Sequence, residues 1–186
     1  MSILAISGSP RENGNTDTLL KTALEVLEQH GIATEFVSLR GKKIMTCTAC
    51  GACAGGRCIL DDDFEPVYQA MAASDGFIVG SPVYFGSAAP ELVSVLDRAG
   101  YVSRSNGNVF SRKVGGPVVV ARRAGQNFTF AQLLMWYMIN GMVVPGSTYW
   151  NIAFGRAPQD VLNDTEGMAT VRSFAENIAW LLSRLR

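Results

Sequence analysis

All four cysteines of the 186-residue chain lie within one short segment. Their spacing is Cys47-x-x-Cys50-x-x-Cys53-x-x-x-x-Cys58. Thiolates bind soft metals, and four of them can complete the ligand set of a [4Fe–4S] cluster. Gaps of two residues let consecutive thiolates converge on one centre, and the neighbouring Gly51, Gly55 and Gly56 allow the backbone to wrap around it. Because the chain has no other cysteine, either all four serve a single site or one of them is spare.

Zinc is the main alternative to a cluster. Structural zinc sites made of four cysteines more often consist of two separated Cys-x-x-Cys pairs. Three evenly spaced cysteines followed by a fourth are more typical of iron–sulfur binding. A loop of free, redox-labile thiols is the third interpretation. The spacing favours the cluster and leaves zinc and free thiols open.

A second group of polar residues follows the first predicted strand, residues 3–6. Residues 7–16 offer hydroxyl, amide and guanidinium groups from Ser9, Arg11, Asn15 and Thr16. They precede a predicted helix, whose first N–H groups have no partner inside the helix and suit a phosphate. The loop matches neither the Walker motif nor the Gly-x-Gly-x-x-Gly fingerprint. An ordinary polar turn with a helix cap is the alternative.

Aromatic residues follow another predicted strand, residues 76–80. The loop after it contains Pro82, Val83, Tyr84, Phe85 and Gly86. A flat heteroaromatic ring could lie against such a loop, with backbone N–H groups serving its carbonyls. The alternative is a loop whose aromatic side chains pack onto the core.

Five predicted strands alternate with five predicted helices. The strands are 3–6, 33–39, 76–80, 116–121 and one within 142–150, and the helices are 16–30, 64–73, 89–99, 127–140 and 164–186, with Thr16 as an N-cap. This alternation predicts one α/β domain, residues 1–186, with a parallel sheet and helices on both faces. The common strand order 2-1-3-4-5 places a ligand between the first and third strands, beyond their carboxyl ends.

The cysteine-rich loop, at about residues 40–60, follows the second predicted strand. We therefore expect it at the same sheet edge as the other two loops, close enough for a joint function.

Asp61, Asp62 and Asp63 follow it and are interpreted as a solvated charge run at the start of the next helix. The helix at 127–140 is apolar on nearly all sides, which indicates burial and favours a homo-oligomer.

Composition excludes several classes of function. Sixteen basic residues balance sixteen acidic ones, so the charge gives no reason to expect nucleic acid or an anionic membrane as partner. The single His argues against a Ser-His-Asp triad and against His-based metal sites. The first residues carry no basic segment before an apolar run, and no run is long enough to span a membrane, so we expect a cytoplasmic protein.

Together, these motifs resemble the NADPH-dependent FMN reductase family, and its iron–sulfur flavoprotein branch in particular. The resemblance covers about residues 1–155. It is carried by Gly8-Ser9-Pro10-Arg11, Gly14-Asn15-Thr16, the cysteine cluster, Gly80 to Gly86, and the downstream segments 121–125 and 141–146.

The resemblance implies a flavodoxin-like three-layer sandwich that binds FMN. Ser9, Arg11, Asn15 and Thr16 would hold the phosphate, and Pro82, Val83, Tyr84, Phe85 and Gly86 would line the isoalloxazine. Arg122 to Gln126 would form a third wall, with Arg122 and Gly125 as binding residues; Gly125-Gln126 replaces the Gly-Gly pair frequent in the family. Cys47, Cys50, Cys53 and Cys58 would ligate a [4Fe–4S] cluster, and the chain would form a dimer or tetramer.

The expected function is therefore an FMN-dependent oxidoreductase that passes electrons between a cluster and FMN. NAD(P)H or a redox partner such as reduced ferredoxin would be the donor. No side chain stands out as an acid or base catalyst. The cofactors would carry the chemistry instead. One alternative is an NAD(P)H-dependent FMN or quinone reductase without a cluster. The other is a non-enzymatic electron carrier or flavin redox sensor.

Overall fold

Three apolar segments become the central strands of a parallel sheet, because both of their faces are covered. The computed structural model describes residues 1–185. In it β1 (Ser2–Ser7), β3 (Gly76–Pro82) and β4 (Val114–Ala121) are buried almost throughout. The less buried β2 (Ala33–Ser38) and the short β5 (Ile152–Phe154) form the edges. The order β2-β1-β3-β4-β5 confirms the predicted topology.

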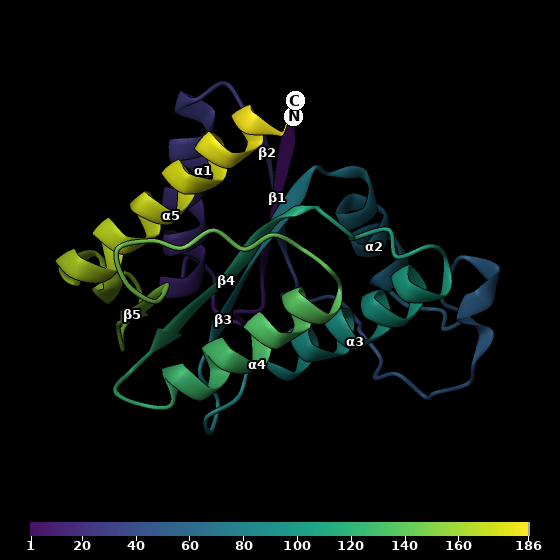
Figure 1. Ribbon diagram of the computed structural model, residues 1–186. Coiled ribbons are helices and arrows are strands. Elements are labelled where there is room, and N and C mark those ends of the chain that lie inside the picture. Colours follow the sequence, from purple (N-terminus) through teal and green to yellow (C-terminus); the bar gives the residue numbers. More distant parts are fainter. Residues whose placement is uncertain (186) are drawn as a thin grey trace.

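Helices cover both faces of the sheet, as the alternation of elements predicts (Figure 1). One face carries α1 (Asn15–Gln29) and α5 (Thr165–Arg184), and the other carries α2 (Phe64–Ala73), α3 (Pro90–Ser105) and α4 (Gln126–Ile139). Alternate side chains of β1 serve the two layers: Ile3 packs with α1 and α5, whereas Leu4 packs with the other three helices. In residues 1–185 we find no helix with the length and apolar character of a membrane span.

The predicted position of the fifth strand, within residues 142–150, is wrong. Val143 does pair with β4, since it bridges Val114 and its N–H donates to Lys113 O at 2.9 Å. The pairing stops there because Pro145 has no N–H to donate. The chain rejoins the sheet only at Ile152, as β5.

Two helix ends also differ from the prediction. The N-cap of α1 is Gly14, whose carbonyl accepts the N–H of Thr18, so that Thr16 already lies within the helix.

Helix α3 continues past Ala99 to Ser105. Gly100 does not end it but makes room for Trp136, whose Nε1 would lie 3.2 Å from a Cβ at position 100. This extension matters because it carries residues that contact the cysteine loop.

A glycine brings α1 close to the carboxyl end of β3. A Cβ at Gly80 would lie 2.6 Å from Leu20 Cδ1 and 2.8 Å from Thr16 Cγ2, both of which belong to α1. The absence of a side chain therefore sets how closely the N-terminus of α1 approaches the loop after β3. The two predicted ligand loops become neighbours in this way.

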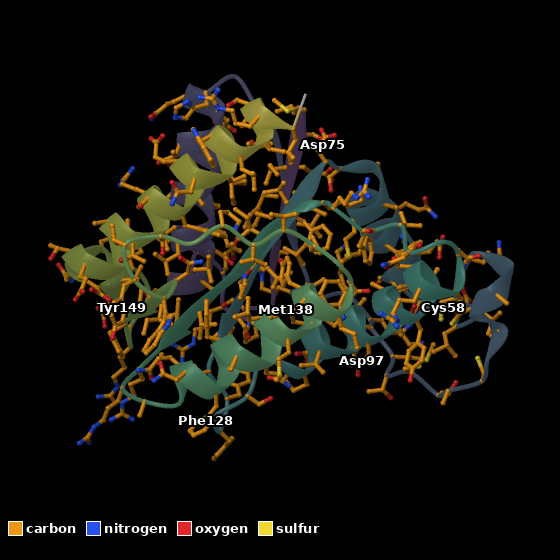
Figure 2. All side chains as sticks on the ribbon, in the orientation of Figure 1. Cys58, Asp75, Asp97, Phe128, Met138 and Tyr149 are labelled. Carbon is orange, nitrogen blue, oxygen red and sulfur yellow. The ribbon has the colours of Figure 1, made fainter. Side chains whose placement is uncertain are left out.

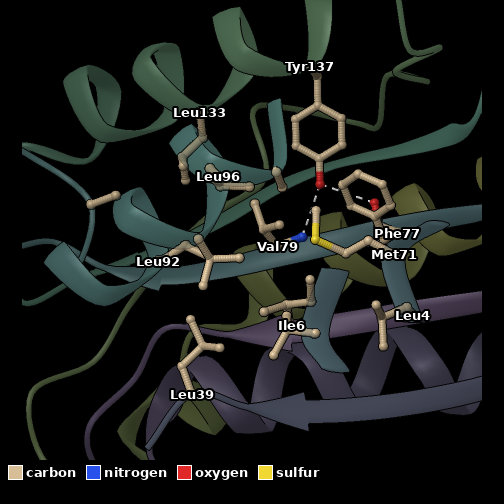
Figure 3. Packing of buried hydrophobic residues seen from close by; sticks show 14 of the residues in the cluster. Leu4, Ile6, Leu39, Met71, Phe77, Val79, Leu92, Leu96, Leu133 and Tyr137 are labelled. Atoms are coloured by element: carbon tan, nitrogen blue, oxygen red, sulfur yellow. Dashed lines mark hydrogen bonds between the residues drawn. The ribbon is translucent and has the colours of Figure 1, made fainter. Parts of the chain in front are cut away.

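Helix α4 packs on the sheet through a small number of residues. Its buried residues are Thr129, Leu133 and Tyr137. The hydroxyl of Tyr137 donates to Phe77 O and accepts the N–H of Val79, both at 3.1 Å (Figure 3). Burial raises the pKa of this phenol well above its usual value. The other side of the helix is not covered within one chain, since Phe128 is 77% exposed, and its expected burial against a second copy stays a prediction.

Tyr137→Phe should lower the free energy of unfolding by about 1–3 kcal/mol, because it leaves a buried N–H and a buried carbonyl without their shared partner. Urea denaturation followed by circular dichroism measures the change. Tyr149→Phe is the matched control, since Tyr149 is 55% exposed and its substitution should change stability by less than about 0.5 kcal/mol. Equal effects of the two substitutions would contradict this account of how α4 docks.

Candidate functional site

The carboxyl ends of the central strands surround one polar cavity of about 360 Å³ at the switch point of the sheet. Eight of the eleven predicted flavin-site residues line it: Ser9, Arg11, Asn15, Thr16, Pro82, Val83, Tyr84 and Arg122. Residues that follow β1, β3 and β4 thus meet in one place, as expected from a parallel sheet. Their individual roles as cofactor ligands stay predictions.

The loop after β1 forms a cradle for a small anion. No side chain of the described residues caps the N-terminus of α1, so its first N–H groups remain available to an anion. Ser9 Oγ accepts the N–H of Arg11 at 3.2 Å, which fixes this hydroxyl at the rim. A Cβ at Gly14 would lie 3.1 Å from Ser9 Oγ and would narrow the cradle. These features fit a phosphate group.

Asn15 and Arg11 connect the cradle to the segment after β5. Asn15 Nδ2 donates to Ala157 O at 2.9 Å, and Asn15 Oδ1 accepts the N–H of Val161 at 3.2 Å. Arg11 Nη1 donates to Arg156 O at 3.0 Å. The carboxamide of Asn15 therefore holds two parts of the wall together, in addition to lining the cavity.

Positive charge dominates the lining. Arg11, Arg122 and Arg156 all border the cavity, and none of its lining residues is acidic. A field of one sign attracts an anionic ligand and lowers the cost of burying its charge. Arginine also suits phosphate because its planar fork can donate two hydrogen bonds at once.

The loop after β3 forms a tight hairpin. Tyr84 and Ser87 exchange backbone hydrogen bonds of 2.9 and 3.0 Å. Between them Phe85 and Gly86 both adopt positive φ angles, 51° and 80°. A bulky residue in this left-handed region is strained, and strain of this kind is concentrated at functional sites. The side chain of Phe85 is fully exposed and lies outside the polar cavity, beside an apolar groove.

The three predicted residues that do not line the cavity lie next to it. Phe85 and Gly86 form the tip of the hairpin, and Gly125 supports its base. A Cβ at Gly125 would lie 3.1 Å from Val83 Cγ1 and 3.2 Å from Gly86 Cα. Gly125 therefore packs the third wall against the hairpin, and Arg122 is the member of that wall that reaches the cavity.

The sequence analysis missed a fourth wall, formed by Gly155, Arg156 and Pro158. These residues directly follow β5, which the prediction placed too early in the chain. The short apolar run 152–154 followed by glycine and arginine was the available signal.

The four cysteines line a second cavity, of about 130 Å³, together with Arg98, Tyr101 and Ser105 of α3. Figure 2 shows Cys58 beside this helix. All four thiols are free, and among residues 1–185 no three His, Cys, Asp or Glu side chains meet closely enough to hold a metal ion.

The expected proximity of the cysteines to the phosphate loop is only partly right. The loop leaves the sheet at the predicted edge, but the cysteine cavity lies against the later turns of α3. Tyr101 lies eleven positions after Pro90, which is at the other end of this helix, and this corresponds to a rise of about 16 Å. An apolar groove bordered by Tyr84, Phe85, Asp97 and Thr46 shares Tyr84 with the polar cavity and shares no lining residue with the cysteine cavity.

The thiols interact with one another electrostatically. A hydrogen bond from the backbone of Ala52 lowers the pKa of Cys50. Burial and then the charges of Cys58, Cys47 and Cys50 raise the pKa of Cys53. Mutual repulsion of this kind is relieved when thiolates share a cationic centre. The four thiols around this cavity are therefore donors of the type that an iron–sulfur cluster requires, although no three of them converge in this structure.

The interpretation of Asp61 to Asp63 as a solvated charge run is wrong for Asp62. Its side chain is 0% exposed and accepts two hydrogen bonds from Arg98, at 2.6 and 2.9 Å. Burial alone would raise the pKa of Asp62, but the hydrogen bond from Arg98 and those from the N–H groups of Met45 and Phe64 lower it. Nothing in the local sequence pointed to this pair, because its members are 36 residues apart.

An anion cradle and an aromatic hairpin at the switch point of a doubly wound sheet define a flavodoxin-like protein. The sequence model of the family described as "NADPH-dependent FMN reductase" matches residues 1–157. The chain therefore belongs to the NADPH-dependent FMN reductase family, and we describe it as a flavoprotein oxidoreductase that uses FMN.

Relatives of similar sequence agree with this assignment, and a solved structure shares the fold. An iron-sulfur flavoprotein of Methanocaldococcus jannaschii is 36% identical over the full length of both chains. An iron-sulfur flavoprotein of Methanosarcina thermophila is 35% identical over all of this chain and 97% of its own. The crystal structure of RosB with a bound 8-demethyl-8-formylriboflavin-5'-phosphate superposes with a TM-score of 0.79 at 18% identity, over all of this chain and 80% of that one. The last match shows the shared fold.

Arg11→Gln should raise the Kd of FMN about tenfold or more, because a hydrogen bond from a charged donor to phosphate contributes about 1.5–3 kcal/mol. Its Kd for riboflavin, which has no phosphate, should stay unchanged. Quenching of flavin fluorescence measures both constants. Arg123→Gln is the control, since Arg123 is exposed and does not line the cavity. An equal loss for FMN and riboflavin would exclude Arg11 as a phosphate ligand.

Proposed function

We propose that this chain binds FMN in the polar cavity and a [4Fe–4S] cluster on Cys47, Cys50, Cys53 and Cys58, and that it passes electrons between the two. The observation that carries the proposal is the presence of two separate cavities of matching chemistry in one chain. One offers free amide groups and arginines, and the other offers four thiols. The iron–sulfur flavoprotein name of its relatives supports the same pairing.

In this proposal the cofactors supply the electron chemistry: a cluster exchanges single electrons, and a flavin exchanges one or two. The residues of the chain bind and orient. The amide groups at the start of α1 and Arg11 hold the phosphate, and Tyr84 borders the ring side of the cavity. Arg122 adds charge at the third wall.

The apolar groove between the two cavities supports their joint use. It is bordered by Tyr84, which also lines the polar cavity, and by Thr46, which directly precedes the first cysteine. The groove therefore borders the polar cavity at one end and includes the residue before the first cysteine in its wall. Its wall includes the exposed ring of Phe85.

A second candidate is an NAD(P)H-dependent FMN or quinone reductase whose cysteines hold no cluster. The description of the matching family favours NADPH as donor. A third, the electron carrier or redox sensor, differs from both because it would not turn over a pyridine nucleotide. Oxidation of NADPH under anaerobic turnover, with FMN or a quinone as acceptor, separates these functions.

We also propose that the protein is a homo-oligomer joined through helix α4. The outward side of this helix presents Phe128, Met135, Met138 and Ile139, which are 77, 71, 66 and 63% exposed. Figure 2 shows Phe128 and Met138 along the same helix. Contiguous apolar side chains of this size are rarely left in water by a single chain. A second copy of the same face would cover them.

Cys50→Ala should remove iron and sulfide while the protein keeps its FMN, because the two cavities use different residues. Protein purified without oxygen should contain about four iron and four sulfide per FMN in the unsubstituted chain. Metal analysis, sulfide assay and the visible spectrum measure this. Ile59→Ala is the control, an exposed loop residue that should keep both cofactors. Zinc alone, or no metal, in the unsubstituted protein would contradict the cluster.

Met138→Asp should reduce the molar mass in solution to that of one chain, because it places a charge in the proposed interface. Light scattering coupled to size-exclusion chromatography measures the mass. Leu162→Asp provides the control, since Leu162 is 51% exposed but belongs to another surface, and this variant should keep the original mass. A monomeric unsubstituted protein would contradict the proposal.

A further inference from the structure

Arg98 is a fully buried arginine on α3 that borders the cysteine cavity. Its side chain is 1% exposed, and its guanidinium lies 4.0 Å from the centre of the Phe64 ring. Nη1 and Nη2 donate to the two carboxylate oxygens of Asp62 at 2.6 and 2.9 Å. A buried guanidinium that donates two hydrogen bonds to one carboxylate has a fixed orientation.

The Arg98–Asp62 pair joins the two ends of the cysteine loop. Before the cysteines, Met45 O accepts from Arg98 Nη1 at 3.1 Å, and Met45 N–H donates to Asp62 at 2.7 Å. After them, Asp62 leads directly into α2. Asn106, just past the end of α3, holds the middle of the loop by donating to Cys53 O at 2.8 Å. The loop is therefore fixed to α3 at its base and at its centre.

One part of the guanidinium remains unused. Nε of Arg98 is buried and has no hydrogen-bond acceptor among residues 1–185. Arg98 and Cys58 border the same cavity. Among the four cysteines, Cys58 is the one nearest in sequence to Asp62, which Arg98 holds. A buried donor without an acceptor costs free energy unless a partner arrives.

We propose that Arg98 is a positioning residue for the cluster: held by Asp62, it donates its Nε–H to the Cys58 thiolate and keeps one positive charge beside the metal centre. This inference rests on the proposed cluster and goes beyond it, because it assigns a role to a residue that is not a ligand. Hydrogen bonds to ligand sulfur and nearby positive charge stabilise the more negative, reduced state of a cluster. They also hold the thiolate in place against dissociation.

The alternative is an ion pair that only closes the loop, since buried ion pairs can be purely structural. A structural role predicts changes in folding and in cluster retention, but not in the reduction potential of the clusters that remain. The reduction potential is therefore the measurement that distinguishes the two roles.

Two variants test the inference in the anaerobically purified protein. Arg98→Lys keeps a charge but has neither the fork nor Nε. The double variant Arg98→Met with Asp62→Asn removes both charges, so no unpaired carboxylate stays buried. Arg57→Lys is the control, because Arg57 is exposed within the same loop. Thermal unfolding and FMN content show whether each variant folds.

We expect both Arg98 variants to release iron to a chelator about tenfold faster or more, as is typical when a partner of a metal ligand is removed. We also expect a lower reduction potential in redox titrations followed by electron paramagnetic resonance, lowest in the double variant. The control should match the unsubstituted protein in both measurements.

Two failures can be told apart. Unsubstituted protein without iron and sulfide overturns the proposed cluster, and the inference with it. Unsubstituted protein that holds a cluster, together with variants of unchanged potential, overturns the role of Arg98 alone, even where iron is released faster. Arg98 would then be a structural ion pair.

Discussion

The candidate site depends on one constraint of the sheet, the reversal of strand order between β1 and β3. The two strands are parallel neighbours, yet α1 crosses one face and α3 lies on the other. The loops that leave their carboxyl ends therefore diverge, and a cavity opens between them. Gly80 keeps that cavity narrow by letting α1 approach β3, so the cradle and the hairpin face a common space.

The cysteine region depends on a different interaction. Its loop contributes few side chains to the core, and hydrogen bonds hold it instead. The Arg98–Asp62 pair closes the base, and the Asn106 side chain fixes the centre. Since both carboxylate oxygens of Asp62 also accept backbone N–H groups, the charge of this residue is well compensated in a buried place. Order in the cysteine loop thus comes from polar contacts with helix α3.

The sequence predicted what local patterns determine. Apolar runs located the central strands, helical periodicity located α1 and α2 closely, and the polar and aromatic loops identified most of the cavity. The errors arose where contacts between residues far apart in the sequence determine the structure. Pairing of residues 142–150 with β4 ends before Pro145, so the last strand forms later, at Ile152–Phe154. The fourth wall of the cavity, which follows this strand, was missed for the same reason. The Arg98–Asp62 pair was invisible because only the folded chain brings its members together.

The base of the cysteine loop has a consequence for how such a protein could arise. Lys43 and Asp63 lie on either side of the loop and share two hydrogen bonds: Asp63 N–H donates to the backbone carbonyl of Lys43 at 3.0 Å, and Lys43 N–H donates to the side-chain Oδ2 of Asp63 at 2.7 Å. The segment between these two residues therefore leaves the domain and rejoins it at one point, between the end of β2 and the start of α2. Segments whose ends meet in this way are the ones that a fold can gain or lose as a unit. The cysteine loop of this chain is therefore an insert in the geometric sense, and a short turn from residue 43 to residue 63 would leave the sheet and its helices uninterrupted.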